Sequence, residues 1–132
     1  MGLEEGLAEA GLKEFSLGAI SIDTALTEIK EFGEKLGQSG NYPDAFVSSS
    51  AMTAIAFISG LETAGKQIGQ DFDVVAKQST MPLDWYRKEI MTIPEDFHEA
   101  GRNLARAVLA LINGEDPQSL QTLESPPLAG QS

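Results

Sequence analysis

The sequence contains no cysteine, which excludes disulfide bonds, thiolate catalysis and cysteine-based metal sites. Its one histidine, His98, is not part of a His-Glu-x-x-His pattern, so nothing in the sequence supports a histidine-based metal site. The glycines form neither Gly-x-x-x-x-Gly-Lys nor Gly-x-Gly-x-x-Gly, and no nucleophile motif is present. We therefore expect a protein that is not an enzyme and that uses neither a metal nor another cofactor.

Basic residues and long apolar runs are also scarce. The chain has 9 Lys and Arg against 20 Asp and Glu, giving a formal net charge of −11, which repels a polyphosphate backbone. No apolar run approaches the length of a membrane span, and the N-terminus is acidic instead of having the basic and then apolar pattern of a signal peptide. We expect a cytoplasmic chain that contacts neither nucleic acid nor a membrane directly.

The 132 residues, 42% of them hydrophobic, have the size and composition of one globular domain. Apolar residues at helical spacing predict helices at residues 2–10, 22–36, 51–64 and 96–113. Short apolar runs predict strands at residues 15–20, 45–48, 72–76 and 90–93. Gly37 is suited to ending the second helix, and residues 80–88 are expected to be irregular. This alternation predicts an α/β fold with a mainly parallel sheet flanked by helices, and the helix at the start suggests a further strand upstream.

Three consecutive serines, Ser48–Ser50 (the serine triplet), stand where the strand at 45–48 ends and the next helix begins. Ligands of open parallel sheets bind beyond the carboxyl ends of the strands. A serine hydroxyl there can cap the helix, and the same helix N-terminus can bind an anion or a ligand hydroxyl. Gln78 follows the next strand, where it can reach a polyol or face water. The sequence leaves both alternatives open.

The helix at 51–64 is apolar on more than one face, so it must pack against something besides its own sheet. Trp85 and Tyr86 form a large aromatic pair within the irregular segment. Such a pair either fills a core or lies at the centre of a protein interface, where aromatic residues are enriched.

Several motifs, taken in order, resemble the LacI/GalR family of transcriptional regulators. They are Pro43-Asp-Ala-Phe-Val, the polar triplet, Gly69-Gln-Asp-Phe-Asp-Val-Val, Met91-Thr-Ile and Leu111-Ile-Asn-Gly-Glu-Asp-Pro. The resemblance implies a two-lobed effector-binding region similar to type I periplasmic binding proteins, preceded by a helix-turn-helix. This chain corresponds to an incomplete C-terminal lobe. Residues 1–93 form most of that lobe, residues 94–116 cross to the N-terminal lobe, and residues 117–132 form a return strand and tail.

The resemblance also implies a ligand site. The family usually has Ala-Asn-Asp at the serine triplet and Gly-Phe-Asp-Asp at residues 76–79. Its Asn and first Asp often bind effector hydroxyls, and their counterparts here are Ser49 and Gln78. Ile20 lies where the family often has a pocket aromatic. The predicted ligand contacts are Ser49, Ser50, Gln78 and Ile20, with a sugar or related polyol as the effector.

Family dimers pack the helix after the triplet and the loop after the Asp-Asp motif. The corresponding residues here are Ala54, Phe57, Ile58, Trp85 and Tyr86. The predicted function is that of an effector-sensing and self-associating fragment of a LacI/GalR-type regulator without its DNA-binding head. Two alternatives remain: a transport-type solute-binding protein of the same fold, and a headless dimerisation module that binds no ligand.

Overall fold

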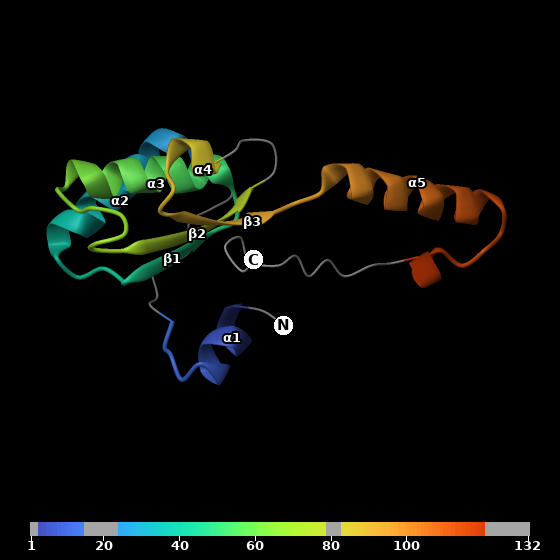
Figure 1. The fold of residues 1–132 in the computed structure, drawn as a ribbon, viewed down its shortest axis with the longest axis horizontal. Helices are drawn as coiled ribbons and strands as arrows, with labels where there is room; N and C mark the ends of the chain where they lie inside the picture. Colours follow the sequence, from blue (N-terminus) through green and yellow to red (C-terminus); the bar gives the residue numbers. More distant parts are fainter. Residues whose placement is uncertain (1–2, 15–23, 79–82, 121–132) are drawn as a thin grey trace.

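A parallel sheet forms the centre of the molecule. The computed structural model describes residues 3–14, 24–78 and 83–120. Within these ranges the sheet has three strands in the order β1-β2-β3 (Figure 1). They are β1 (Ala45–Ser48), β2 (Asp73–Gln78) and β3 (Ile90–Pro94). The predicted parallel α/β fold is confirmed, and the strand predicted at residues 15–20 lies outside the described residues.

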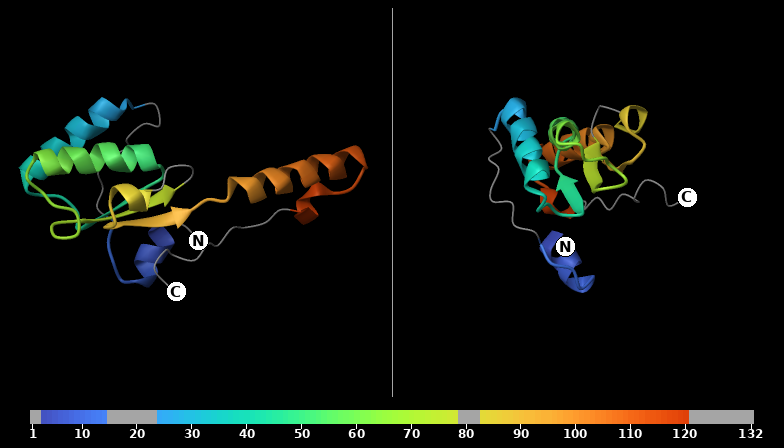
Figure 2. Two further views of the ribbon diagram at one scale, coloured as in Figure 1. Left: turned by 45° about the horizontal axis from the view of Figure 1, so that its top comes forward. Right: turned by 90° about the vertical axis from the view of Figure 1, so that its left-hand side faces the viewer.

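Helices flank the sheet, as predicted. Helices α2 and α3 lie side by side and cover one face, and the short α4 contacts β3 (Figures 1 and 2). Helix α5 follows β3 and projects away from the sheet, and its main contacts are with the turn η1. The helical elements are α1 (Leu3–Glu9), α2 (Leu26–Ser39), α3 (Ala51–Thr63), α4 (Leu83–Tyr86), α5 (Phe97–Ile112) and the 3-10 turn η1 (Pro117–Leu120).

The core lies between the sheet and the pair α2 and α3. Alternate strand residues point into it, because successive side chains of a strand face opposite sides of the sheet. Phe46 of β1 packs edge-on against Phe57 of α3, with ring centroids 4.7 Å apart, and against Phe72, at 5.8 Å. On the opposite side of the sheet, Val47 and Met91 are exposed. The described helices therefore cover only one face closely.

Glycines set the spacing between α2 and α3, and this overturns the prediction that Gly37 ends α2. The helix continues to Ser39, and Gly40 caps it with a φ of 71°. Gly37 instead faces α3, where an added Cβ would lie 2.7 Å from the Cβ of Ala64. At Gly60 of α3 an added Cβ would lie 2.0 Å from the carbonyl oxygen of Lys30. The close approach of the two helices therefore requires glycine at these positions.

Other boundaries differ from the prediction by a few residues. Helix α2 begins at Leu26, later than predicted, since Ala25 has an extended backbone with a ψ of 146°. The segment predicted to be irregular contains α4. Helix α5 agrees with its prediction, and the Asp96 carboxylate caps it by accepting from the Glu99 N–H at 2.9 Å. None of the described helices combines the length and apolarity needed to cross a bilayer.

Candidate ligand-binding site

The serine triplet connects the end of β1 to the first turn of α3. Ser50 is the N-cap of α3, and its Oγ accepts a hydrogen bond from the backbone N–H of Thr53 at 3.2 Å. The same hydroxyl donates to the Thr53 hydroxyl at 2.9 Å, and the Ser48 hydroxyl donates to the Ser50 carbonyl at 2.8 Å. The capping role considered from the sequence is therefore present, and it occupies Ser48, Ser50 and Thr53.

Ser49 differs from its two neighbours. Its side chain is exposed, and its hydroxyl has no hydrogen-bond partner among the described residues. A serine hydroxyl can donate one hydrogen bond and accept two. Of the three serines, Ser49 therefore has the most capacity left for a ligand.

An open pocket of about 720 Å³ lies beside the triplet. This volume is within the range of small-molecule sites, about 300–1,000 Å³. The pocket joins the carboxyl end of β1 to the N-terminal parts of α2 and α3. Its described lining residues are Thr24, Leu26, Ile29, Phe46, Val47, Ser48, Ser49, Ser50, Met52, Thr53, Ala54, Phe57 and Val74.

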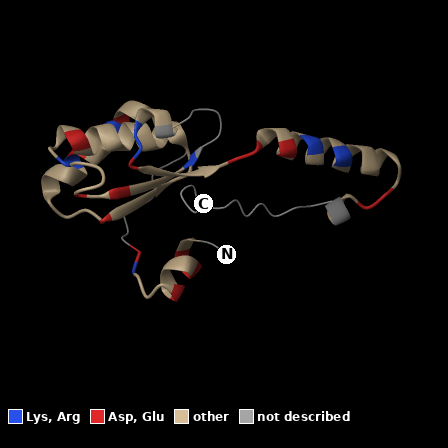
Figure 3. Ribbon diagram, viewed as in Figure 1, with Lys and Arg blue, Asp and Glu red and all other residues tan. Residues whose placement is uncertain are grey.

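The described pocket lining combines hydroxyl groups with apolar side chains and contains no charged residue. Hydroxyls come from the triplet, Thr24 and Thr53, whereas Val47 and Met52 contribute apolar surface that is 59% and 51% exposed. Charged residues lie elsewhere on the chain, on α1, α2, α3, α5 and β2 and in the segment leading into α5 (Figure 3). The pocket can therefore offer hydrogen bonds and apolar contacts to a ligand.

Among the hydroxyl-bearing residues of this lining, sequence reasoning missed Thr53 and Thr24. Thr53 follows Ser50 by three residues, and the Ser-x-x-Thr spacing could have identified it as a partner in the cap. Thr24 carries no such signal, because its place in the pocket depends on how α2 packs against α3.

The other two predicted ligand contacts are Gln78, of which the structure describes the backbone, and Ile20, which it does not describe. Gln78 is the last residue of β2 and pairs with Pro94 of β3, and its side chain is not described. Ser48 pairs with Ala76, so Gln78 lies two positions further along the strand direction than Ser48. Ile20 lies outside the described residues. The roles predicted for Gln78 and Ile20 remain predictions.

The residues predicted at a dimer interface divide into two groups. Ala54, Phe57 and Ile58 are buried within the chain, where α3 packs against α2 and the sheet. Trp85 of α4 is 86% exposed, and Tyr86 is also exposed. Within the chain, the Arg87 guanidinium lies 5.6 Å from the centroid of the Tyr86 ring.

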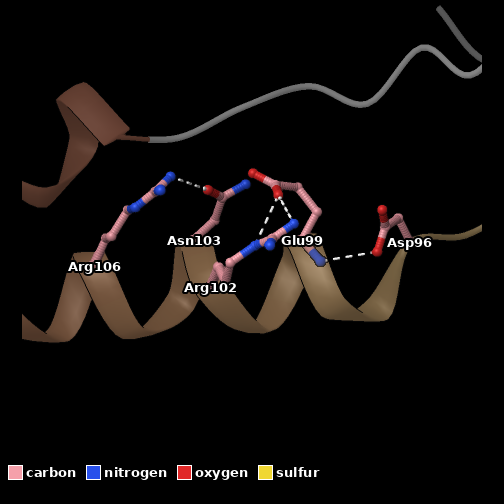
Figure 4. A network of polar contacts seen from close by, with 5 residues as sticks. All are labelled: Asp96, Glu99, Arg102, Asn103 and Arg106. Atoms are coloured by element: carbon pink, nitrogen blue, oxygen red, sulfur yellow. Dashed lines mark hydrogen bonds and ion pairs between the residues drawn. The ribbon is translucent and has the colours of Figure 1, made fainter.

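Helix α5 has one polar side and one exposed apolar side. On the polar side, Arg102 donates to the Glu99 carboxylate and Arg106 donates to Asn103 (Figure 4). The opposite side carries exposed apolar residues at helical spacing, which we call the α5 stripe: Phe97, Leu104, Val108, Leu111 and Ile112. His98 is exposed on the first turn, and the described residues contain no cluster of three side chains suited to holding a metal.

The chain is similar to a known protein family and to solved structures. The chain matches the model of the periplasmic binding protein-like domain family over residues 3–132. No significant match was found among curated proteins.

Two similar solved structures are regulators. A LacI family transcriptional regulator from Arthrobacter sp. FB24, in complex with lactose, superposes with a TM-score of 0.72 at 20% identity, covering 96% of this chain and 46% of that one. The transcription regulator CcpA of Lactococcus lactis gives a TM-score of 0.72 at 18% identity, covering 95% of this chain and 45% of its own. At such identities the likeness shows a shared fold, and this chain spans about half the length of each structure.

Proposed function

We propose that this chain, which belongs to the periplasmic binding protein-like domain family, is the effector-sensing part of a transcription regulator of the LacI type. The observation that carries the proposal is the position of the pocket, at the carboxyl end of β1 and the N-terminus of α3. Open parallel sheets bind their ligands beyond the carboxyl ends of the strands. The role is binding without catalysis.

The α5 stripe supports a place for this chain in a longer protein. An amphipathic helix gains most of its stability by packing its apolar side, yet this side of α5 is exposed in the described structure. The two similar regulators each contain about as much chain again as this one covers. We infer that residues 94–116 cross to a second lobe, that this lobe covers the stripe, and that residues 117–132 return from it.

In such a protein the effector would act as a switch. A ligand that contacts both lobes stabilises the closed arrangement relative to the open one, and it shifts the population by its difference in affinity for the two. Closure of the lobes would in turn change the affinity of a DNA-binding head. The Ser49 hydroxyl has no partner among the described residues and Gln78 ends the next strand, so these two residues are the proposed effector contacts.

Titration calorimetry of the chain with neutral sugars and polyols, lactose among them, tests the proposal. Ser49→Ala removes one hydrogen bond to the ligand, which should weaken binding about threefold to tenfold. Thr27→Ala is the matched control, because it removes an exposed hydroxyl of α2 outside the pocket lining. Equal affinities of the two variants would remove Ser49 from the site, and the absence of any binding would contradict the effector role.

The family match itself favours a second candidate, a transport-type solute-binding protein of the same fold. The coding sequence upstream of Met1 separates the two. A helix-turn-helix there supports a regulator, and a signal peptide followed by the rest of the lobes supports transport.

Self-association is a further part of the proposal, and Trp85 and Tyr86 are its basis. Exposed aromatic side chains are favoured anchors at interfaces. Since Ala54, Phe57 and Ile58 are buried within the chain, the exposed pair on α4 is the part of the predicted interface that a second copy can reach.

A further inference from the structure

We propose that the pocket selects an uncharged amphipathic ligand, with hydroxyl groups along one edge and an apolar face along the other, and that it rejects phosphorylated forms of the same molecule. Nucleosides and aryl or alkyl glycosides belong to this class. The inference rests on the proposed effector role and specifies the ligand that this site would take.

The first argument is charge. The described lining has no charged side chain, although 22% of the chain is Asp, Glu, Lys or Arg. A phosphate group needs a basic side chain or several free backbone N–H groups. The N-terminus of α3 is the local donor, and one of its N–H groups, that of Thr53, already donates to Ser50. The formal net charge of −11 adds repulsion against an anionic ligand.

Two basic residues at the flanking strand and helix ends are already paired with acidic side chains. Lys77 near the end of β2 forms an ion pair with Glu95, and Arg87 after α4 forms one with Glu62 at 2.8 Å. Both bases have an acidic partner within the chain. The α3 dipole is therefore the main feature of the described lining that favours an anion, and its effect is small for a partly exposed site.

The second argument is the hydroxyl edge. Ser48, Ser50 and Thr53 are engaged with one another, which fixes the positions of their oxygens. Ser49 stands among them with its hydroxyl free of partners in the described structure. A neutral hydroxyl both donates and accepts, so it can exchange hydrogen bonds with a ligand hydroxyl without requiring a charge.

The third argument is the apolar side of the pocket. Val47 and Met52 expose more than half of their surface next to the hydroxyl edge. The unbranched, polarizable side chain of methionine adapts to aromatic and aliphatic groups of different shapes. A ligand that is polar on all sides would leave this surface in contact with water, whereas an aryl group or nucleobase would cover it.

Calorimetry of the full chain with two matched series tests the proposal. One series is a nucleoside and its 5′-monophosphate; the other is phenyl glucoside, methyl glucoside and methyl glucoside 6-phosphate. We expect the neutral member to bind at least about tenfold more tightly than its phosphate, and phenyl glucoside to bind more tightly than methyl glucoside. A phosphate that binds as tightly as its neutral partner, or equal affinities of the two glucosides, overturns the inference.

Two substitutions assign the apolar contact. Met52→Ser should reduce the preference for phenyl over methyl glucoside, while Met91→Ser should leave it unchanged. Met91 is a matched control because it is 47% exposed on β3 and outside the pocket lining, against 51% for Met52. Binding of hydroxyl-rich sugars alone would overturn this inference and leave the proposed effector role standing. A panel in which nothing binds would contradict both.

Discussion

The hydroxyl of Ser50 accepts a hydrogen bond from the Thr53 N–H at 3.2 Å and donates one to the Thr53 hydroxyl at 2.9 Å. These two bonds join the end of β1 to the first turn of α3, because Ser50 follows the strand and caps the helix. The same turn forms one side of the pocket. The cap therefore contributes to stability and holds the pocket wall in place.

Ser50→Ala should lower the free energy of unfolding by about 1 kcal/mol, the usual cost of losing a serine N-cap. Urea denaturation measures this change. Ser50→Asp should retain most of the stability, since a carboxylate also accepts from the N–H groups of the first turn. Ser49→Ala is the control and should change stability by less than about 0.5 kcal/mol, because its hydroxyl has no partner in the described structure. A larger loss for Ser49→Ala than for Ser50→Ala would contradict the assignment of the cap.

A second prediction follows from the close approach of α2 and α3. Gly60→Ala should destabilise the protein by about 1–3 kcal/mol, although alanine favours a helix. Its Cβ would lie 2.0 Å from the Lys30 carbonyl oxygen and 2.8 Å from the Glu34 nitrogen, and both are backbone atoms that cannot move independently of the helix.

Gly101→Ala is the matched control within another helix. An added Cβ there meets no atom within 4 Å, so the higher helix propensity of alanine should help the stability of α5. Thermal unfolding of both variants checks the pair. A stabilised Gly60→Ala would show that the two helices lie further apart than in the structure.

These glycines also show where sequence reasoning reaches its limit. The cap at Ser50 and the strand at 45–48 were predictable, because both depend on residues that are close in sequence. The role of Gly37 was not, because a glycine after a run of helical spacing equally suits a helix end, and only the crossing with α3 explains a glycine inside the helix. The strand after Phe72 was predicted with its end two residues short, since Lys77 and Gln78 are polar but still pair with β3.

The pocket, too, could be predicted only in part from the sequence. The serine triplet was predictable as the end of a strand, but Thr24 and Leu26 join it through the tertiary position of α2. The extra apolar surface of α3 was recognised, yet the sequence could not say whether a partner chain or α2 covers it. In the described structure Phe57 packs against Phe32 of α2, and Ile58 is buried in the same core.

Trp85 gives a prediction about association. Trp85→Ala should weaken self-association, because it removes the most exposed large hydrophobic side chain among the described residues. Sedimentation equilibrium over a range of protein concentrations measures the effect. Leu12→Ala, which truncates an exposed apolar residue just after α1, serves as the control. If Trp85→Ala and the unmodified chain associate equally, Trp85 is not part of the contact.

Helix α5 should be the least protected of the long helices in the chain by itself. Its main contacts are with η1, and Ala110 is its only buried residue, whereas α3 has six buried residues. Most of the stability of a helix in a protein comes from tertiary packing, so α5, whose 16 residues include one buried residue, should open frequently. Amide hydrogen exchange measured by NMR should therefore be faster in α5 than in α3 by several orders of magnitude.

Leu104→Gln should leave the free energy of unfolding of the sheet and α3 unchanged. Leu61→Ala should lower that free energy by about 2–5 kcal/mol, since Leu61 is fully buried. Equal protection of α5 and α3 would mean that the stripe is covered in solution, by a second copy or by another part of the chain.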